Sequence, residues 1–367
     1  MTIREAMSEE SSTWTSLQAL FANRGFLLVV PRPAGTTIAR EMMMKCWSAI
    51  LQLSTLLLCL AASGNASVTL TLDLYQTPDG AITVNEHGDF VDPYFANRAL
   101  TLADESDMDV KGITERWIPW LIAHQLSDGR FQRYCKAGGS DWTPCKPSDA
   151  DDAGLAVWLE LLYRLAPASG LPAAWQASAS RANRYLEDLR DKNTGLYFVS
   201  HDLQVCLLMD NVEIYHLFRM MAAANRRFGP TKLSRDYEKR ADNLRRAIVH
   251  HLWSTSRHRF MASTQEPGPT SFYPTDVAQV YPWLFKMQTP AGDAKVAFRR
   301  WLNSHGNVWL DRSKDQFPWG MVALAANQFG ETQSVDRWLE NSKSLRHSAY
   351  WTVLDETLVQ LLQTRAH

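Results

Sequence analysis

The sequence predicts an all-α fold in which a ring of inner helices is enclosed by a ring of outer helices. Two kinds of helical segment alternate along the chain, one amphipathic and the other apolar on every side, and short β-prone segments lie between them. A helix that is apolar all round must be buried all round, whereas an amphipathic helix can cover it and still face water. A double ring satisfies both requirements.

The amphipathic segments are expected on the outside of the ring. In 234–253, Tyr237, Leu244 and Ile248 share one face, and charged residues cover most of the rest. The same pattern occurs in 175–189, 291–304 and 332–345. The segments expected as inner helices are 155–162, 212–224, 277–285, 319–326 and 351–362.

The short β-prone segments are expected on one rim of the ring, where the inner helices begin. They are 128–131, 195–198, 259–261 and 307–310. About eleven helices can be counted, one short of six hairpins, so a twelfth lies in 67–90 or the ring closes with an unpaired helix. An open α-solenoid is the alternative architecture, although the sequence shows no clear repeat of fixed period.

The first 66 residues resemble a leader rather than part of the fold. Lys45 precedes an apolar run from Trp47 to Ala62, and Gly64-Asn65-Ala66 places small residues where a signal peptidase reads them. We expect 1–41 to be a spurious N-terminal extension, 42–66 a signal peptide and 67–367 a single toroid domain. The protein would then be periplasmic or secreted, and it would contact a membrane only through an uncleaved signal, because the apolar run is short for a span.

Export changes how the five cysteines are interpreted. Cys46 and Cys59 would leave with the signal, whereas Cys135 and Cys145 remain in a loop rich in Gly and Pro. An oxidising compartment would allow these two to form a disulfide. Cys206 lies in an apolar stretch and is expected to be a buried free thiol. The cysteine and histidine spacing predicts no metal site, and we expect no cofactor.

The charge balance excludes some kinds of partner. Lys and Arg number 38 against 39 Asp and Glu, so nucleic-acid binding through bulk positive charge is not expected. The hydrophobic fraction of 46% is enough for a large core and argues against disorder. The 14 Trp residues are many for this length, and they either fill the core or stack on flat ligands such as sugar rings.

Polar residues gather where the apolar helices begin. The four groups are Asn85 to Asp89 with Asp92, Ser148 to Asp152, Asp210 to Glu213, and Tyr273 to Asp276. Helix capping accounts for one carboxylate per helix. It does not account well for three acids within 149–152, nor for an acid inside an apolar helix at 213. In a ring these groups would converge on one cavity.

Convergent carboxylates beside aromatic residues predict glycoside chemistry. Hydrolysis requires one protonated acid at the leaving oxygen and one ionised carboxylate that activates water or attacks the sugar. The tryptophans considered as sugar platforms are Trp142, Trp283, Trp309, Trp319 and Trp351.

The helix pattern and motif order resemble the six-hairpin, (α/α)6 toroid glycosidases, and among them glycoside hydrolase family 8, which includes bacterial endoglucanases. The resemblance spans 84–287 at the level of motifs. Glu86 stands where the family has the Glu of a Glu-Gly-Gln segment, and 148–151 resembles its Thr-Asp-Ala-Asp. Residues 276–281 resemble the family's Asp-Ala-x-Arg-Val-Tyr, with Gln279 in place of the Arg.

The resemblance implies a hydrolase that acts on a β-glucan or an exopolysaccharide, with inversion as the expected outcome. Glu86 would be the general acid and Asp276 the base, while Asp151, with Asp149 as its substitute, would bind and distort the sugar. Asp92 is the rival acid if Glu86 lies outside the cavity. The other residues expected at the sugar site are Asn211, Glu213, Tyr281, Trp283, Trp319 and Trp351.

Two other functions remain open at this stage. Because the first and third motifs differ from the family pattern, the chain could bind a saccharide without cleaving it, as a scaffold in a polysaccharide secretion complex. A polysaccharide lyase or epimerase on the same architecture would use a His or Tyr base near a cation, and Tyr215, His216 and Arg219 are the candidates. His216 on an apolar helix is more often a core residue.

Overall fold

A computed structural model describes residues 68–138, 141–265 and 271–364, so the expected extension (1–41) and signal peptide (42–66) lie outside the described residues. In this part there are eleven α-helices, α3 to α13. The inner helices are α3 (Pro93–Glu105), α5 (Asp151–Leu165), α7 (Leu208–Phe228), α9 (Val280–Leu284), α11 (Gly320–Gln328) and α13 (Val353–Thr364). The outer helices are α4 (Lys111–Ala123), α6 (Ala173–Asp188), α8 (Thr231–Leu252), α10 (Ala294–Leu310) and α12 (Thr332–Ser342). None of the described helices combines the length and hydropathy needed to cross a bilayer.

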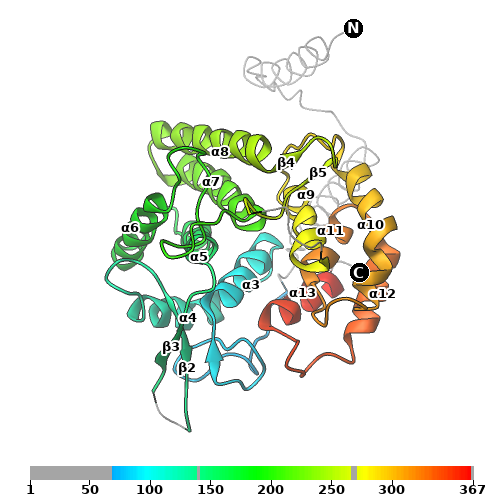
Figure 1. Ribbon diagram of the computed structural model, residues 1–367. Coiled ribbons are helices and arrows are strands. Elements are labelled where there is room, and N and C mark those ends of the chain that lie inside the picture. Colours follow the sequence, from blue (N-terminus) through cyan, green and yellow to red (C-terminus); the bar gives the residue numbers. More distant parts are fainter. Residues whose placement is uncertain (1–67, 139–140, 266–270, 365–367) are drawn as a thin grey trace, which may run out of the picture. The chain divides into compact units, whose positions relative to one another are not determined.

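The inner helices form a closed ring. Each contacts the next in chain order, and α13 returns to contact α3 (Figure 1). The double ring predicted from the alternating helices is therefore confirmed, and closure excludes the open solenoid. Residues 68–90 contain no helix, so within the described residues the ring closes with α13 unpaired.

The burial pattern follows the predicted division into inner and outer helices. On the outer helix α8, the buried residues include Tyr237, Leu244 and Ile248, which are the face that the sequence predicted. On the inner helix α5, every residue from Leu155 to Leu162 is buried. Tertiary burial of the apolar inner helices therefore supplies the core of the toroid.

Short strands occupy the rim. β1 (Phe90–Val91), β2 (Gln132–Cys135) and β3 (Thr143–Pro147) form an antiparallel sheet, and β4 (Trp253–Ser254) pairs with β5 (Arg259–Phe260). Cys135 and Cys145 form a disulfide between β2 and β3, with their Cα atoms 5.7 Å apart, while Cys206 is a buried free thiol. The prediction for 307–310 is wrong, because these residues are the last turn of α10.

A buried ion network ties three inner helices together. Arg98 on α3 lies 3.0 Å from Glu160 on α5 and 2.9 Å from Glu213 on α7, and all three are buried. Burial alone would raise the pKa of Glu160, but the charges of His216 and Arg98 lower it to about 2. Removing one member would leave an uncompensated buried charge, which is strongly destabilising. The network therefore favours the arrangement of α3, α5 and α7 in which all three side chains meet.

Candidate functional site

The starts of the inner helices surround one cavity of about 320 Å³. Its lining comes from the starts of α3, α5, α7, α11 and α13, from α9, and from the loops before α9 and α11. The acids that line it are Asp92, Asp149, Asp210, Asp315 and Asp355, and no Lys, Arg or His is among the described lining residues. We refer to it as the acidic cavity. The sequence predicted that inner-helix starts would converge, and this geometry agrees.

Asp92 is held at the start of α3 by helix capping. Its side chain accepts a hydrogen bond from the Tyr94 backbone N–H at 3.1 Å, and Pro93 follows at the first helical position, where a missing N–H costs nothing. The residue is only 6% exposed. Burial raises the pKa of Asp92 to about 6, which keeps a proton on this carboxyl in mildly acidic solution.

Arg133 links Asp92 to Asp149. The register of β2 and β3 shifts between Arg133 and Tyr134, and Arg133 Nη1 lies 3.9 Å from Asp92 Oδ2 and 3.7 Å from Asp149 Oδ1. The two carboxylate oxygens are therefore no more than about 8 Å apart, which admits both the roughly 5 Å of retaining and the roughly 6.5 Å of inverting glycosidases. The Asp149 side chain is 84% exposed, so it can meet water directly.

Asp152 and Asp210 form a carboxyl pair at the edge of the cavity. Both are buried, and burial together with the charge of Asp210 raises the pKa of Asp152 well above its ordinary value, which makes Asp152 the protonated member and the hydrogen-bond donor of the pair. Burial, with the nearby charge of Glu213, raises the pKa of Asp210 to about 7. Two neighbouring buried carboxyls do not both ionise, so the pair carries at most a single negative charge near neutral pH.

Aromatic rings form the outer part of the acidic cavity. Tyr273 and Trp319 stack with their ring centroids 4.5 Å apart, and Phe317 meets Trp319 edge-on at 6.3 Å. Trp319 has φ 51° and ψ 57°, a left-handed conformation that is strained for a non-glycine residue and often occurs at functional sites. Within the described residues its Nε1–H is buried without an acceptor, so it can donate to a ligand.

The remaining wall is held by internal hydrogen bonds. Tyr94 lines the cavity and donates its hydroxyl to Glu213 at 2.8 Å. Asp355 accepts from the Thr352 hydroxyl at 2.7 Å and from the Gly320 backbone N–H at 3.3 Å, which joins α13 to the start of α11. These contacts fix the wall, and they leave Asp92, Asp149 and Asp210 as the carboxyls best placed to meet a substrate.

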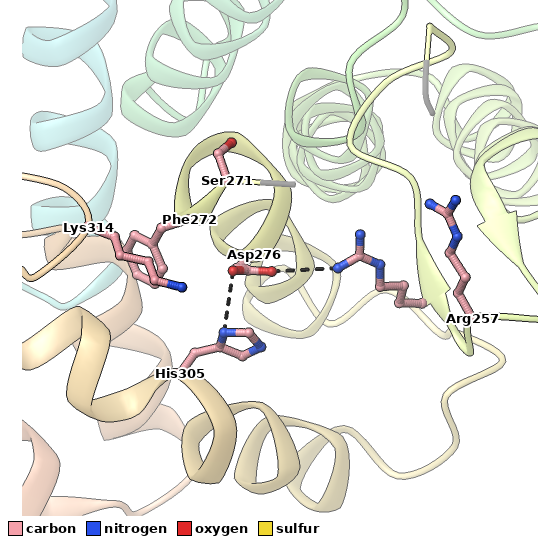
Figure 2. Close-up of a pocket in the computed structure, with 7 residues that line it drawn as sticks. Arg257, Ser271, Phe272, Asp276, His305 and Lys314 are labelled. Carbon is pink, nitrogen blue, oxygen red and sulfur yellow. Dashed lines mark ion pairs between the residues drawn. The ribbon is translucent and has the colours of Figure 1, made fainter. Parts of the chain in front are cut away.

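A second cavity of about 490 Å³ carries the opposite charge. Its residues are Arg257, Arg259, Ser271, Phe272, Asp276, His305 and Lys314 (Figure 2). Asp276 lies between Arg259 Nη1, at 3.6 Å, and His305 Nδ1, at 3.4 Å. We refer to it as the cationic cavity.

The structure does not bring Glu86, Asp151 and Asp276 together in one cavity. Glu86 pairs with His347, because a turn and β1 separate its motif from α3, whose capping residue is Asp92 instead. Asp151 lies 3.7 Å from Arg130 and 3.5 Å from the Tyr185 hydroxyl, outside the lining of the acidic cavity. Asp276 lies in the cationic cavity.

Four other residues predicted for the sugar site lie outside the lining of the acidic cavity. Asn211 is buried and makes hydrogen bonds with the backbone of Tyr197, and Glu213 belongs to the Arg98 network. Trp283 is core, and Trp351 is buried and donates to Glu356. The predicted residues that do line the acidic cavity are Asp92, Asp149, Tyr281 and Trp319.

One group of side chains offers metal-ligand atoms close together. Atoms of Glu105, Glu160 and His216 lie within 4.8 Å of one another. Glu160, however, already pairs with Arg98 and with His216 at 3.2 Å. His216 is therefore a residue of the core network, which removes one of the two bases, Tyr215 and His216, considered for a lyase.

Several residues that line the acidic cavity, and Arg133 next to it, were missed by the sequence reasoning. Asp210 stood in a motif that had been singled out, but only its neighbours Asn211 and Glu213 were assigned to the sugar site. Arg133, Asp315 and Phe317 have no local signal, since their positions depend on a β-bulge and on a loop. Tyr273 had one usable signal, because it precedes a proline in a polar segment at a predicted inner-helix start.

Comparison with solved structures identifies the fold. Rex8A from Paenibacillus barcinonensis, solved with xylose, superposes with a TM-score of 0.54 at 15% identity, covering 78% of this chain and 85% of that one. A reducing-end xylose-releasing exo-oligoxylanase gives 0.54 at 12% identity, with 78% and 84% covered. An α-amylase from Clostridium perfringens gives 0.52 at 13% identity, with 80% and 94% covered. No protein-family model matches the chain, and no curated protein sequence matches it.

Proposed function

We propose that this chain, which has the (α/α)6 fold of the six-hairpin glycosidases, is a glycoside hydrolase that cleaves a polysaccharide in the acidic cavity. The observation that carries the proposal is Asp92, a buried carboxyl at an inner-helix start whose pKa is raised to about 6 beside an exposed second carboxylate. Asp92 is the general acid at the leaving oxygen. Asp149 is the ionised partner that activates water or attacks the sugar.

The lining of the cavity supports a neutral backbone at the cleavage point. A uronate ring would add negative charge to a cavity with five acids and no basic residue among those described as lining it. A β-glucan or an exopolysaccharide with neutral rings is the substrate class that we propose.

The aromatic mouth supports the binding of an extended saccharide. Tyr273 and Phe317 are 45% and 44% exposed, which is unusual for large apolar side chains, and they flank the half-buried Trp319. Aromatic faces of this kind provide apolar contact area for a sugar ring at low entropic cost. A chain of sugars can therefore lie across the mouth and place one linkage next to Asp92.

We further propose that the protein acts outside the cytoplasm, in the periplasm or as a secreted enzyme, and that it requires no cofactor. The Cys135–Cys145 disulfide supports an oxidising compartment. Association with a polysaccharide secretion complex would follow from such a location, and co-purification from a cell envelope is the measurement that checks it.

The decisive experiment measures reducing-end release from a panel of neutral and anionic polysaccharides. Asp92→Asn keeps the helix cap, because Asn caps as well as Asp, but it removes the proton donor. We expect its kcat to fall by about 10²–10⁴-fold. Glu86→Gln is the matched comparison, and we expect it to stay within about threefold of the wild type. Unchanged turnover in Asp92→Asn would contradict the assignment of the acid.

The same experiment tests the non-catalytic alternative. The position of Asp276 in the cationic cavity favours that alternative, because the base implied by the family resemblance is then missing from the acidic cavity. Saccharide binding without release of reducing ends from any polysaccharide in the panel would identify a binding protein. Reducing-end release that depends on Asp92 and Asp149 would exclude it.

A further inference from the structure

The cationic cavity has more positive charge than its own acid can neutralise. Arg259 and Lys314 line it with His305, and Asp276 is the single acid among the described lining residues. Even with His305 neutral, the lining carries an excess of positive charge. Arginine side chains favour planar anions such as carboxylates and phosphates, because their N–H groups match two oxygens at once.

The contacts of Asp276 orient the cations without saturating them. Its distances of 3.6 Å to Arg259 and 3.4 Å to His305 exceed the usual lengths of charge-assisted hydrogen bonds, which are about 2.7–2.9 Å. Arg259 therefore keeps N–H groups that can bind an incoming anion. Figure 2 shows Asp276 between these two partners, with both ion pairs drawn as dashed lines.

The cavity is built on a rigid frame. Trp301 on α10 donates its Nε1–H to the Asp276 backbone carbonyl at 2.8 Å, and its ring packs against His305 with centroids 5.3 Å apart. The Trp301 ring also stacks on Phe298 in the core, with centroids 5.9 Å apart. Asp276 and His305 are thus fixed from behind, which lowers the cost of ordering the site when it binds.

The two cavities share walls. Phe272 faces the cationic cavity while the next residue, Tyr273, lines the acidic cavity. In a second segment, Lys314 lines the cationic cavity and Asp315 lines the acidic one. Adjacent residues are only about 3.8 Å apart along the backbone, so the cavities meet across two peptide segments. The cavities therefore lie on opposite sides of these two segments, close enough for a substituent of a saccharide in the acidic cavity to reach around them to the cationic one.

We propose that the cationic cavity binds an anionic substituent, a carboxylate or a phosphate ester, on the saccharide whose neutral rings occupy the acidic cavity. The substrate class is then a polysaccharide with a neutral backbone and anionic side groups. This inference rests on the proposed function for the placement of the sugar, but the anion site itself can be measured without catalysis.

The experiment is a binding titration with the full chain, using glucose 6-phosphate, glucuronate, inorganic phosphate and glucose as probes. We expect the first two to bind and glucose to bind at least tenfold more weakly. Lys314→Gln should weaken glucose 6-phosphate binding about threefold or more, whereas Lys239→Gln, on the outer face of α8, should not change it. Asp276→Asn should strengthen binding, because it removes the negative charge from the lining.

Each outcome bears on the inference. Equal affinity for glucose and glucose 6-phosphate, or weaker anion binding in Asp276→Asn, would overturn it. Inorganic phosphate that binds as tightly as glucose 6-phosphate without inhibiting polysaccharide cleavage would show a site for free anions and also overturn it. Anion binding in a protein that cleaves no polysaccharide would refute the proposed function and leave the anion site standing, so the two failures are distinguishable.

Discussion

The acidic and cationic cavities share two segments of chain, yet different charges face the buried carboxyls in each cavity. In the acidic cavity, Asp92 and Asp355 have pKa values raised to about 6 by burial, and Arg133 is the one cation that lowers the value of Asp92. In the cationic cavity, burial also raises the pKa of Asp276, but His305, Arg259 and Lys314 all oppose it. The pKa of Asp276 is raised overall as well, so the cavities differ in the charges that face the carboxyl and not in the direction of its pKa shift.

The pH profile gives the largest expected effect on this comparison. If Asp92 acts as the general acid, kcat/KM falls about tenfold per pH unit above its pKa of about 6, and at pH 8 it is roughly a hundredfold below the maximum. The loss occurs on the alkaline side, because the pKa is raised and the active form is protonated. Initial rates from pH 4 to 9 check this.

The control for that profile is Asp276→Asn, which changes the cationic cavity alone. We expect its alkaline limb on a neutral polysaccharide to coincide with that of the wild type. The result that would contradict this is an alkaline limb that moves in Asp276→Asn and persists in the residual activity of Asp92→Asn. The titration would then belong to the cationic cavity and not to Asp92.

The aromatic mouth gives the next effect. Trp319→Ala should weaken binding of a neutral oligosaccharide about tenfold, or roughly 1–1.5 kcal/mol, because it removes both the ring face and the Nε1–H donor. Trp319→Phe keeps a ring and loses the donor, so its affinity should lie between those of the wild type and Trp319→Ala. Calorimetric titration checks the order, and an affinity for Trp319→Ala equal to that of the wild type would show that the sugar does not contact this ring.

The smallest effect concerns stability. The pKa of Asp210 is raised to about 7, so the folded state holds a proton that the unfolded state releases, and stability falls as the pH rises from about 4 to 7. Asp210→Asn removes this titration, and its side-chain carbonyl can still accept the hydrogen bond from Asp152. Between pH 5 and 8 we expect the wild-type Tm to fall by roughly 2–4 °C more than that of the variant.

The exposed Asp202 provides the matched substitution for the stability measurement. Asp202→Asn should reproduce the wild-type dependence of Tm on pH. If the plots of Tm against pH were parallel for the wild type and Asp210→Asn, the carboxyl pair would not hold its proton in the folded state.

Most of the fold could be predicted from the sequence, because the spacing of apolar residues in each helix indicates which of its faces are buried. The apolar segments 155–162 and 212–224 lie within inner helices, and the amphipathic 234–253 forms most of an outer helix. The error at 307–310 arose because a β-prone composition can be accommodated in the last turn of a helix whose apolar side chains are buried.

The site was less readable, since it depends on where each helix begins. Glu86 and Asp92 are six residues apart, and only the turn and β1 between them decide which carboxyl caps α3 and enters the cavity. Trp319 and Trp351 both precede inner helices, but only Trp319, whose backbone is left-handed, lines the acidic cavity. The spacing of residues in the sequence does not indicate which of two residues near a helix start lies at the cavity.

Closure of the ring by α13 on α3 has a consequence for how the chain folds. The Gln360 side chain makes two hydrogen bonds to the backbone of Thr71, 289 positions earlier, and the Val353 N–H donates to the Val84 carbonyl. Contacts of such sequence separation form slowly, because a long loop must close before they contribute. The apolar inner helices thus stay incompletely covered until the last helix docks, so aggregation during synthesis competes with a single late step.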